Sequence, residues 1–457
     1  MTPAPPRPIR RETARLLGLA WPVMLTSLNW TLLQITDVMV VGLVSTEEVA
    51  ALGASRALGF VGIVTGLAWL SGVLVMAARA DGAGDLPRTG GVLREGLVLG
   101  LLLGLAIGAL FLVAAEPLLG LIGVAVDRID ESARVVRAFA IAYPFQLVNV
   151  AAAFFLEAVS RPRRVTVVNL SVLPINAVLA WALAGGHLGL PALGAVGAAL
   201  ATSIASLLGA VGMVASALTL PRAAPRELRR FDRAAWASVP RGAWALASFG
   251  LVPAIASGLE LAGFSILIAL STQLGDAAAH AFQIVFSIHN LTFSIALGLG
   301  SAAGVRAGNA VGEGQPEAAV HRTLIAVLLA IVALGAGALL LAIGARNIVL
   351  LFPATAAVQA LAGTMLAVWA PFIIFDGVQV VLVYALRSLG DQVAAGINSI
   401  LAFFIVSGGL GWWLVHAGLG PMALVWGSGA GMLAAALLHG GRFGVISSRL
   451  RRSRPQS

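Results

Sequence analysis

The sequence contains no cysteine and no lysine, and charged residues of any kind are scarce. Without cysteine the chain has no disulfide framework and no thiolate metal site. Only 11% of its 457 residues are charged and 59% are hydrophobic, whereas soluble domains have about 25% charged and about 45–50% apolar residues. This composition excludes an ordinary soluble domain and predicts a membrane protein with several spans.

Motifs of nucleotide and metal chemistry are also missing. The chain has no G-x-x-x-x-G-K-[ST] phosphate loop, no H-E-x-x-H and no Cys/His ligand spacing. We therefore expect no enzyme activity and no cofactor. All 29 basic residues are arginines, which gives a net charge of +9. We interpret these arginines as charges of loops and termini that set the topology, and we expect no nucleic-acid partner.

Twelve apolar runs approach the length of about 20 residues that crosses a hydrocarbon core. The runs are 17–44, 49–79, 92–115, 133–158, 165–185, 191–219, 243–271, 277–308, 322–345, 361–388, 393–416 and 421–444. No strands alternate at barrel period, and backbone in lipid must satisfy its own hydrogen bonds, so we predict an all-α integral membrane protein. The first run is too long for a signal-peptide core, so we expect it to be an uncleaved span.

Arginine is unevenly distributed between the two sides of the predicted spans. It is concentrated at the N-terminus, after the second, fourth and sixth spans, and in the C-terminal tail, and all of these segments fall on one side. The opposite side is poorer in arginine. By the positive-inside rule, we expect a multi-pass protein of the inner membrane with both termini in the cytoplasm.

The longest polar break is an Arg-rich segment that divides the chain into two similar halves. We predict an N-terminal six-helix lobe at 1–220, a cytoplasmic linker at 221–242 and a C-terminal six-helix lobe at 243–457. The turn at 81–85 corresponds to the turn at 311–315, one half later. Six spans per half make the repeat parallel, with a pseudo-twofold axis along the membrane normal and a substrate path between the lobes.

Three carboxylates lie inside apolar runs: Asp37 in the first half, and Glu260 and Asp376 in the second. A charged side chain at the centre of a membrane helix costs about 2.5–3.5 kcal/mol, so each acid is a candidate functional group. If Glu260 and Asp376 face each other, the pair can exchange a proton or a Na⁺ ion. The alternative is that these acids only hydrogen-bond neighbouring helices.

Polar and aromatic side chains share helix faces with these acids. The candidate substrate or cavity residues are Trp30, Gln34, Asn169, Asn176, Phe264, Gln283, Phe286, His289, Asn290, Phe372 and Gln379. The two asparagines could orient Asp37, although asparagine often only holds helices together. His289 could titrate near neutral pH, but we favour the acids as the coupling site.

Several motifs resemble the multidrug and toxic compound extrusion (MATE) family over essentially the whole chain. They are the segment 279–312, the stretch 37–42 after Pro22, and the stretches 376–379 and 385–391. The presence of both second-half acids is similar to the NorM-type branch. The chain departs from the family pattern at Phe372, where a tyrosine is common, and in the span around Pro174.

The resemblance implies a V-shaped, two-lobe antiporter that exports amphipathic or cationic compounds by alternating access. Export would be in exchange for Na⁺ or H⁺, with Glu260 and Asp376 binding the cation and Asp37 also important. We expect a monomer whose partners are small-molecule drugs and the lipid bilayer. The alternative within the superfamily is a lipid-linked glycan flippase, but such a protein should need arginines rather than acids at mid-membrane.

Overall fold

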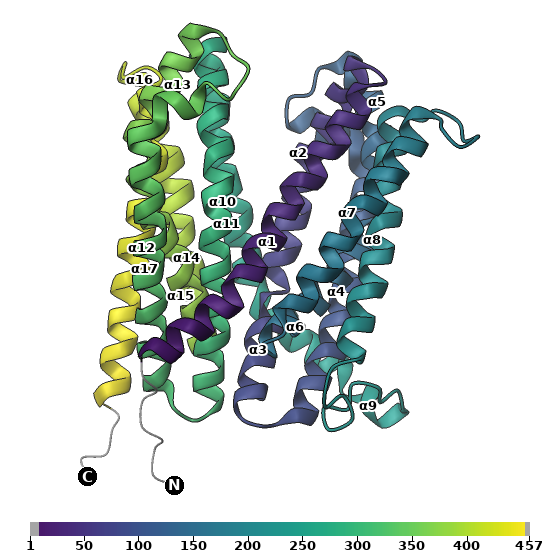
Figure 1. Cartoon of the computed structure of the whole chain (residues 1–457), viewed down its shortest axis with the longest axis vertical. Helices are drawn as coiled ribbons and strands as arrows, with labels where there is room; N and C mark the ends of the chain where they lie inside the picture. The colour runs from purple at the N-terminus through teal and green to yellow at the C-terminus, as the bar shows by residue number, and fades with distance from the viewer. Residues whose placement is uncertain (1–8, 453–457) are drawn as a thin grey trace. The chain divides into compact units, whose positions relative to one another are not determined.

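The structure is a computed structural model that describes residues 9–452, apart from the side chains of residues 46 and 47. Arg7 of the arginine-rich N-terminus and Arg454 of the C-terminal tail lie outside these residues. All regular elements of the described chain are helices (Figure 1). They are α1 (Ile9–Gly42), α2 (Thr46–Trp69), α3 (Ser71–Gly82), α4 (Leu86–Leu121), α5 (Val126–Ala140), α6 (Tyr143–Ala158), α7 (Pro162–Gly185), α8 (Gly194–Leu218), α9 (Arg233–Ala237), α10 (Val239–Gln273), α11 (Asp276–Gly312), α12 (Pro316–Val349), α13 (Ala356–Trp369), α14 (Phe372–Leu389), α15 (Gln392–Ser399), the π-helix η1 (Ile400–Leu410), α16 (Gly411–His416) and α17 (Met422–Arg452).

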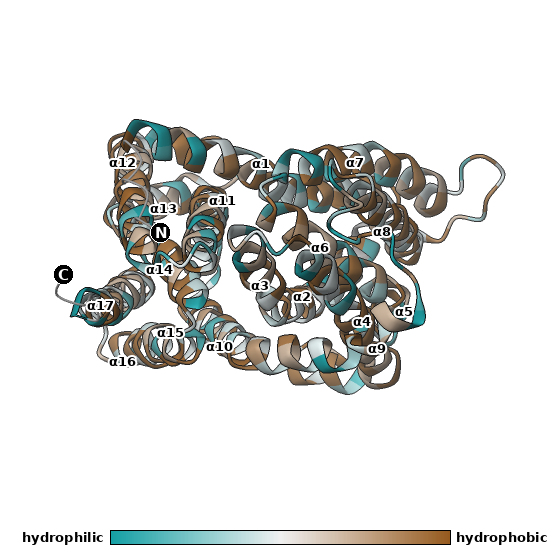
Figure 2. Ribbon diagram, turned by 90° about the horizontal axis from the view of Figure 1, so that it is seen from below, coloured by the Kyte–Doolittle hydropathy of each residue, from teal (hydrophilic) through white to brown (hydrophobic). Residues whose placement is uncertain are grey.

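The helices confirm the predicted membrane class. Within residues 9–452, eleven helical segments are long and apolar enough to cross a membrane, and the α5–α6 pair, bent by 45°, makes up to twelve. Large apolar side chains remain exposed on them, such as Val113 at 84% and Leu340 at 71%. Figure 2 shows hydrophobic (brown) residues along the length of most helices. Such surfaces suit hydrocarbon rather than water.

The predicted span boundaries differ from the helices in two ways. Several helices are longer than the apolar run, as in α4, where the run covers 92–115. Polar residues extend these helices beyond the hydrocarbon, which hydropathy alone does not register. The predicted span 361–388 also includes a break, since α13 ends at Trp369 and α14 begins after Pro371. Proline has no backbone N–H to donate, which favours a helix start at this point.

The chain forms two compact units. Within the described residues, unit 1 contains 9–24, Gly82–Gly84 and 255–452, and unit 2 contains Leu25–Asp81 and Asp85–Ala254. Two long helices, α1 and α10, therefore belong partly to each unit. In each helix the boundary between the two units lies within a few residues of a proline inside the helix, Pro22 in α1 and Pro253 in α10. The predicted division at 221–242 concerns the sequence repeat and stays a prediction.

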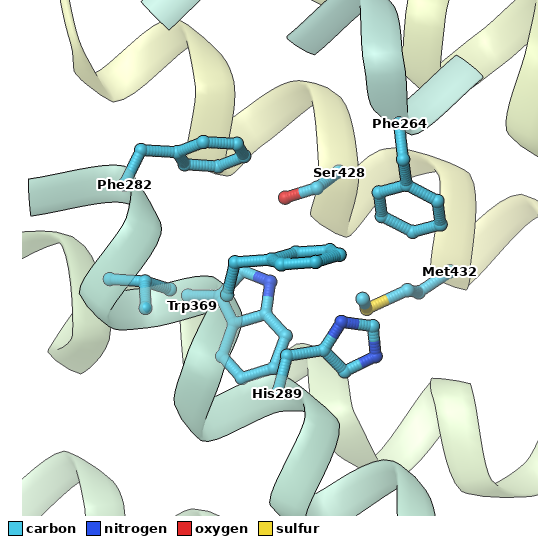
Figure 3. Close-up of a pocket in the computed structure, with 8 residues that line it drawn as sticks. Phe264, Phe282, His289, Trp369, Ser428 and Met432 are labelled. Atoms are coloured by element: carbon cyan, nitrogen blue, oxygen red, sulfur yellow. The ribbon is translucent and has the colours of Figure 1, made fainter. Parts of the chain in front are cut away.

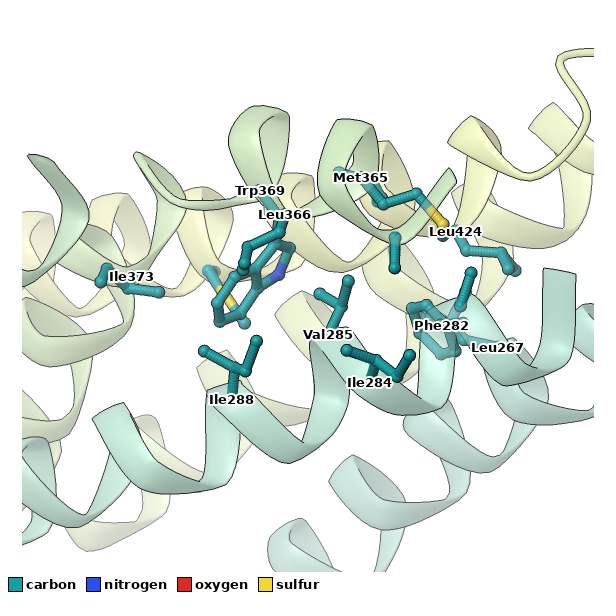
Figure 4. Close-up of a cluster of buried hydrophobic side chains, with 14 of the residues drawn as sticks. Leu267, Phe282, Ile284, Val285, Ile288, Met365, Leu366, Trp369, Ile373 and Leu424 are labelled. Atoms are coloured by element: carbon teal, nitrogen blue, oxygen red, sulfur yellow. The ribbon is translucent and has the colours of Figure 1, made fainter. Parts of the chain in front are cut away.

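Unit 1 has an apolar core in which α13 packs against α11 (Figure 4). Met365, Leu366 and Trp369 of α13 meet Ile284, Val285 and Ile288 of α11, with Leu267 of α10 and Leu424 of α17 alongside. All eight side chains are buried. Because lipid is as apolar as these residues, close van der Waals packing rather than exclusion from water stabilises the contact.

Unit 2 is held together by a stripe of small residues on α4. Gly100, Gly104 and Gly108 lie four residues apart, so they share one face of the helix. An added Cβ at each would press against backbone atoms of Leu147, of Tyr143 and Pro144, or of Ala140. The glycines therefore allow α4 to approach the α5–α6 backbone closely, as small residues do in membrane helices.

Candidate functional site

Asp376 is a buried carboxylate in the second turn of α14, with 4% of the residue exposed. His289 Nε2 on α11 lies 3.1 Å from its Oδ2 atom, and Gln379 Nε2 donates to its Oδ1 atom at 3.1 Å. The hydrogen-bond assignments of the histidine and the amide follow from this network. Each carboxylate oxygen therefore has a nitrogen partner, and one of these partners is an imidazole.

Close helix packing positions Asp376. The next residue, Gly377, lies so near Leu334 of α12 that a Cβ could not be added without displacing that side chain. This contact fixes α14 against α12 and turns the acid toward α11. His289 is 7% exposed, so the Asp376–His289 pair is shielded from solvent. In such surroundings a polar interaction is stronger than in water, and an unpaired polar group is costly.

His289 is surrounded by aromatic rings. Its ring centroid lies 5.1 Å from that of Trp369, 5.6 Å from Phe293, 5.8 Å from Phe286 and 6.0 Å from Phe264. The faces of such rings attract cations. A positive charge beside Asp376 would therefore be attracted by these rings.

A small pocket adjoins this aromatic group (Figure 3). It is lined by Phe264, Phe282, Val285, Phe286, His289, Trp369, Ser428 and Met432, and Figure 3 shows the rings of His289, Trp369 and Phe264 around it. Its cavity volume is about 10 Å³. Pockets for drug-sized ligands are typically about 300–1,000 Å³. In this conformation the pocket therefore has room for about one water molecule and for no drug-sized ligand.

Glu260 on α10 is half-buried, and within the described chain its side chain has no hydrogen bond or ion pair assigned. It interacts electrostatically with Asp376 and with Arg387, near the end of α14. Unit 1 thus brings the two predicted acids within electrostatic range of each other, without direct contact. Arg387 carries the balancing positive charge, and its buried Nε atom has no hydrogen-bond partner among the described residues.

Asp37 belongs to a separate polar cluster in unit 2, and 2% of it is exposed. Asn176 Nδ2 on α7 donates to its Oδ1 atom at 2.7 Å, and Thr202 Oγ1 on α8 donates to its Oδ2 atom at 3.3 Å. Arg56 Nη2 on α2 lies 2.5 Å from the same Oδ2 atom. Asn169 does not contact the acid; its backbone carbonyl accepts a hydrogen bond from Asn29.

The remaining candidate residues lie in different surroundings. Gln283 and Asn290 are exposed on α11, Gln34 is exposed on α1, and Trp30 is half-buried. Phe372 packs against Trp426 of α17 and is not among the residues that line the pocket. Their predicted roles in substrate binding stay predictions.

Sequence reasoning predicted that Asn176 could orient Asp37, which the 2.7 Å hydrogen bond bears out, but it missed the other contacts of the acids. Arg56 is a charge inside an apolar run, a signal that could have marked it as the counter-ion of an intramembrane acid. The hydrogen bond between His289 and Asp376 joins two helices whose packing the sequence does not specify. His439 of α17 was also overlooked, although it lies inside a predicted span; it is fully buried and interacts electrostatically with Arg387.

Comparisons with known proteins agree with this architecture. The MatE family model matches residues 22–182 and 242–413. The chain is 31% identical to the probable multidrug resistance protein NorM of Bradyrhizobium diazoefficiens, over 96% of this chain and 94% of that protein. It is 32% identical to the multidrug resistance protein NorM of Burkholderia vietnamiensis, over 98% and 97% of the two chains.

A solved structure shares the fold. The crystal structure of the eukaryotic MATE transporter AtDTX14 matches with a TM-score of 0.85 and 22% identity, over 97% of this chain and 99% of that one. The predicted resemblance is confirmed. The chain is a multi-pass membrane transporter and not an enzyme, and it belongs to the MatE family, in the branch of its NorM-named relatives.

Proposed function

We propose that this chain is a multidrug efflux antiporter that exports amphipathic or cationic compounds in exchange for protons. The observation that carries the proposal is Asp376, a buried carboxylate joined to an imidazole at 3.1 Å inside an apolar unit. An intramembrane acid paired with a histidine is the kind of group from which proton relays are built. The names of the relatives support drugs as substrates.

The ligand geometry favours a proton over Na⁺. A hard cation requires several oxygen ligands, but both oxygens of Asp376 already have nitrogen partners. Within residues 9–452, no group of three or more His, Cys, Asp or Glu side chains could hold a metal ion. A proton needs only one oxygen or one imidazole nitrogen. We therefore assign proton exchange to Asp376, His289 and Glu260.

Competition between proton and drug then drives export. When Asp376 and Glu260 are ionised, their charge attracts an organic cation, and the aromatic rings around His289 can contact its apolar part. Protonation removes that charge and releases the drug. The exchange of one proton for one monovalent cation moves no net charge, whereas the export of a neutral drug against one proton gains about 2.3 kcal/mol per 100 mV.

An efflux assay in cells tests this function. Cells that express the chain should retain less ethidium, an amphipathic cation, than cells without it, and a protonophore should abolish the difference. The result follows because the proton gradient is the proposed energy source. Efflux that persists after the proton gradient has collapsed, but stops when Na⁺ is removed, would contradict proton coupling.

We also propose that the chain acts as a monomer in the inner membrane, with both termini in the cytoplasm. The arginine distribution supports this orientation, because arginine is concentrated on the side that faces the cytoplasm. The helix α10 has 35 residues, roughly 50 Å at 1.5 Å per residue, which is enough to cross a bilayer.

Cysteine labelling tests the orientation without background, since the chain has no cysteine of its own. Ser238 and Thr272 are exposed and lie near opposite ends of α10. In intact cells a membrane-impermeant maleimide should label Thr272→Cys but should label Ser238→Cys only after permeabilisation. The reverse pattern would place the termini outside the cytoplasm.

A further inference from the structure

Asp37, the acid in unit 2, already forms an ion pair with a side chain of the protein itself. Cation coupling at Asp37 does not explain this ion pair. Arg56 Nη2 lies 2.5 Å from Asp37 Oδ2, with 17% of the arginine side chain and 3% of the aspartate side chain exposed. Arg56 Nη1 also donates to the backbone carbonyl of Gln34 at 2.6 Å. The guanidinium is thus bound at two places on α1, one turn apart, and it spans the site where another cation would reach the acid.

The other groups around Asp37 are neutral. Asn176 and Thr202 donate to its two oxygens, and within the described chain Arg56 is the only charged group that acts on it. One acid and one base give the cluster no net charge. The corresponding set in unit 1 differs, because it has two acids, Asp376 and Glu260, and among residues 9–452 Arg387 is the only arginine that acts on Glu260.

We propose that Arg56 is a tethered counter-ion that takes the place of a coupling ion at Asp37, so that unit 1 alone exchanges ions. This inference rests on the proposed efflux function and restricts its ion exchange to unit 1. It assigns Arg56 a positioning role, since Arg56 acts by keeping Asp37 occupied.

The physical reason is the cost of a buried unpaired charge. A proton that bound Asp37 would cancel its charge and leave the partly buried Arg56 without a counter-charge, and Na⁺ would have to compete with the guanidinium for Asp37 Oδ2. Both outcomes are unfavourable. Arginine stays protonated in proteins, so Arg56 cannot avoid this cost by losing its own proton. The attached cation therefore excludes free cations from the site.

Removal of both charges, on Asp37 and on Arg56, distinguishes an Asp37 that only pairs with Arg56 from an Asp37 that binds the coupling ion. Asp37→Asn alone should lower proton-driven ethidium transport in liposomes by about tenfold or more, because Arg56 is left unpaired. In Asp37→Asn/Arg56→Gln both charges are absent, and transport should return to within about threefold of the unaltered protein. If Asp37 carried a coupling ion, Arg56→Gln could not rescue its loss, since no ionisable group would remain.

A binding measurement counts the ions directly. In Arg56→Gln, Asp37 loses its counter-ion while Asn176 Oδ1, which has no hydrogen-bond partner among the described residues, remains beside it. The site should then bind one additional cation that competes with the substrate. Each tenfold rise in proton concentration should weaken ethidium binding to the purified protein by about tenfold more than in the unaltered protein. In Asp37→Asn/Arg56→Gln, ethidium affinity should depend on proton concentration as it does in the unaltered protein.

Glu116→Gln/Arg137→Gln is the matched control, because this ion pair lies in the same unit at 2.7 Å but is 51% and 40% exposed. This double variant should change neither ethidium transport nor the dependence of ethidium affinity on proton concentration. The proposal would be overturned if Asp37→Asn/Arg56→Gln folds but is as inactive as Asp37→Asn. It would also be overturned if Asp37→Asn transports fully, or if Arg56→Gln leaves the dependence of ethidium affinity on proton concentration unchanged. If the unaltered protein transports no ethidium under a pH gradient, the proposed function fails instead.

Discussion

Replacement of Asp376 by asparagine is expected to lower proton-driven efflux by about 100-fold or more, in line with the loss of a positioned acid–base group. An amide cannot carry the proton that the cycle exchanges, and it removes the charge that attracts an organic cation. Asparagine has the same shape and can still hydrogen-bond His289 and Gln379, which are both 3.1 Å away in the unaltered protein. The fold should therefore persist, and the loss should be specific to transport.

The measurement is ethidium transport into liposomes under an imposed pH gradient, with ethidium binding as a second readout. Asp276→Asn is the control, because Asp276 is an exposed carboxylate at the start of α11 in the same unit. It should transport normally. Glu260→Gln should show a loss similar to that of Asp376→Asn. Normal proton-driven transport by both Asp376→Asn and Glu260→Gln would show that proton exchange takes place elsewhere.

A large effect on stability is expected from Glu12→Gln. Glu12 and Arg306 are 2% and 5% exposed and form a two-pronged ion pair, with Nε–Oε1 at 2.5 Å and Nη2–Oε2 at 2.9 Å. The pair joins the first part of α1 to α11 within unit 1. Glutamine leaves the guanidinium buried without a counter-charge, which costs roughly 3–5 kcal/mol. Thermal unfolding in detergent should show a clearly lower midpoint.

Two variants identify the cause of this loss. Glu116→Gln makes the same chemical change in an ion pair that is 51% and 40% exposed, and it should cost no more than about 1 kcal/mol. Glu12→Gln/Arg306→Gln removes both buried charges and should regain most of the lost stability. If Glu12→Gln unfolds at the same temperature as the unaltered protein, the ion pair does not hold α1 to unit 1.

The sequence predicted most of the fold because membrane spans follow from local composition. Twelve apolar runs were long enough to cross a bilayer, and within residues 9–452 the helices give eleven such spans, or twelve if the bent α5–α6 pair is one span. Hydropathy could not predict where the helices end, because polar residues at the ends of α4 and α12 continue the same hydrogen-bonding pattern into the interface. It also could not predict η1, since a π-helix depends on how its side chains pack.

The candidate site was only partly predictable. Intramembrane acids are costly, so Asp37, Glu260 and Asp376 were visible in the sequence. Spacing along a helix shows which residues share a face, but it does not show which helix that face meets. The contacts of Asp376 with His289 and of Asp37 with Arg56 both join different helices, and neither could be derived from spacing.

If protons that enter through unit 1 drive export, a pH gradient and a Na⁺ gradient imposed separately on the purified protein should give different results. The purified chain would be placed in liposomes under a pH gradient without Na⁺, and in a second arm under a Na⁺ gradient at equal pH. We predict that ethidium accumulates against its gradient in the first arm and does not accumulate in the second. Accumulation under the Na⁺ gradient alone would show that Na⁺, and not the proton, drives export.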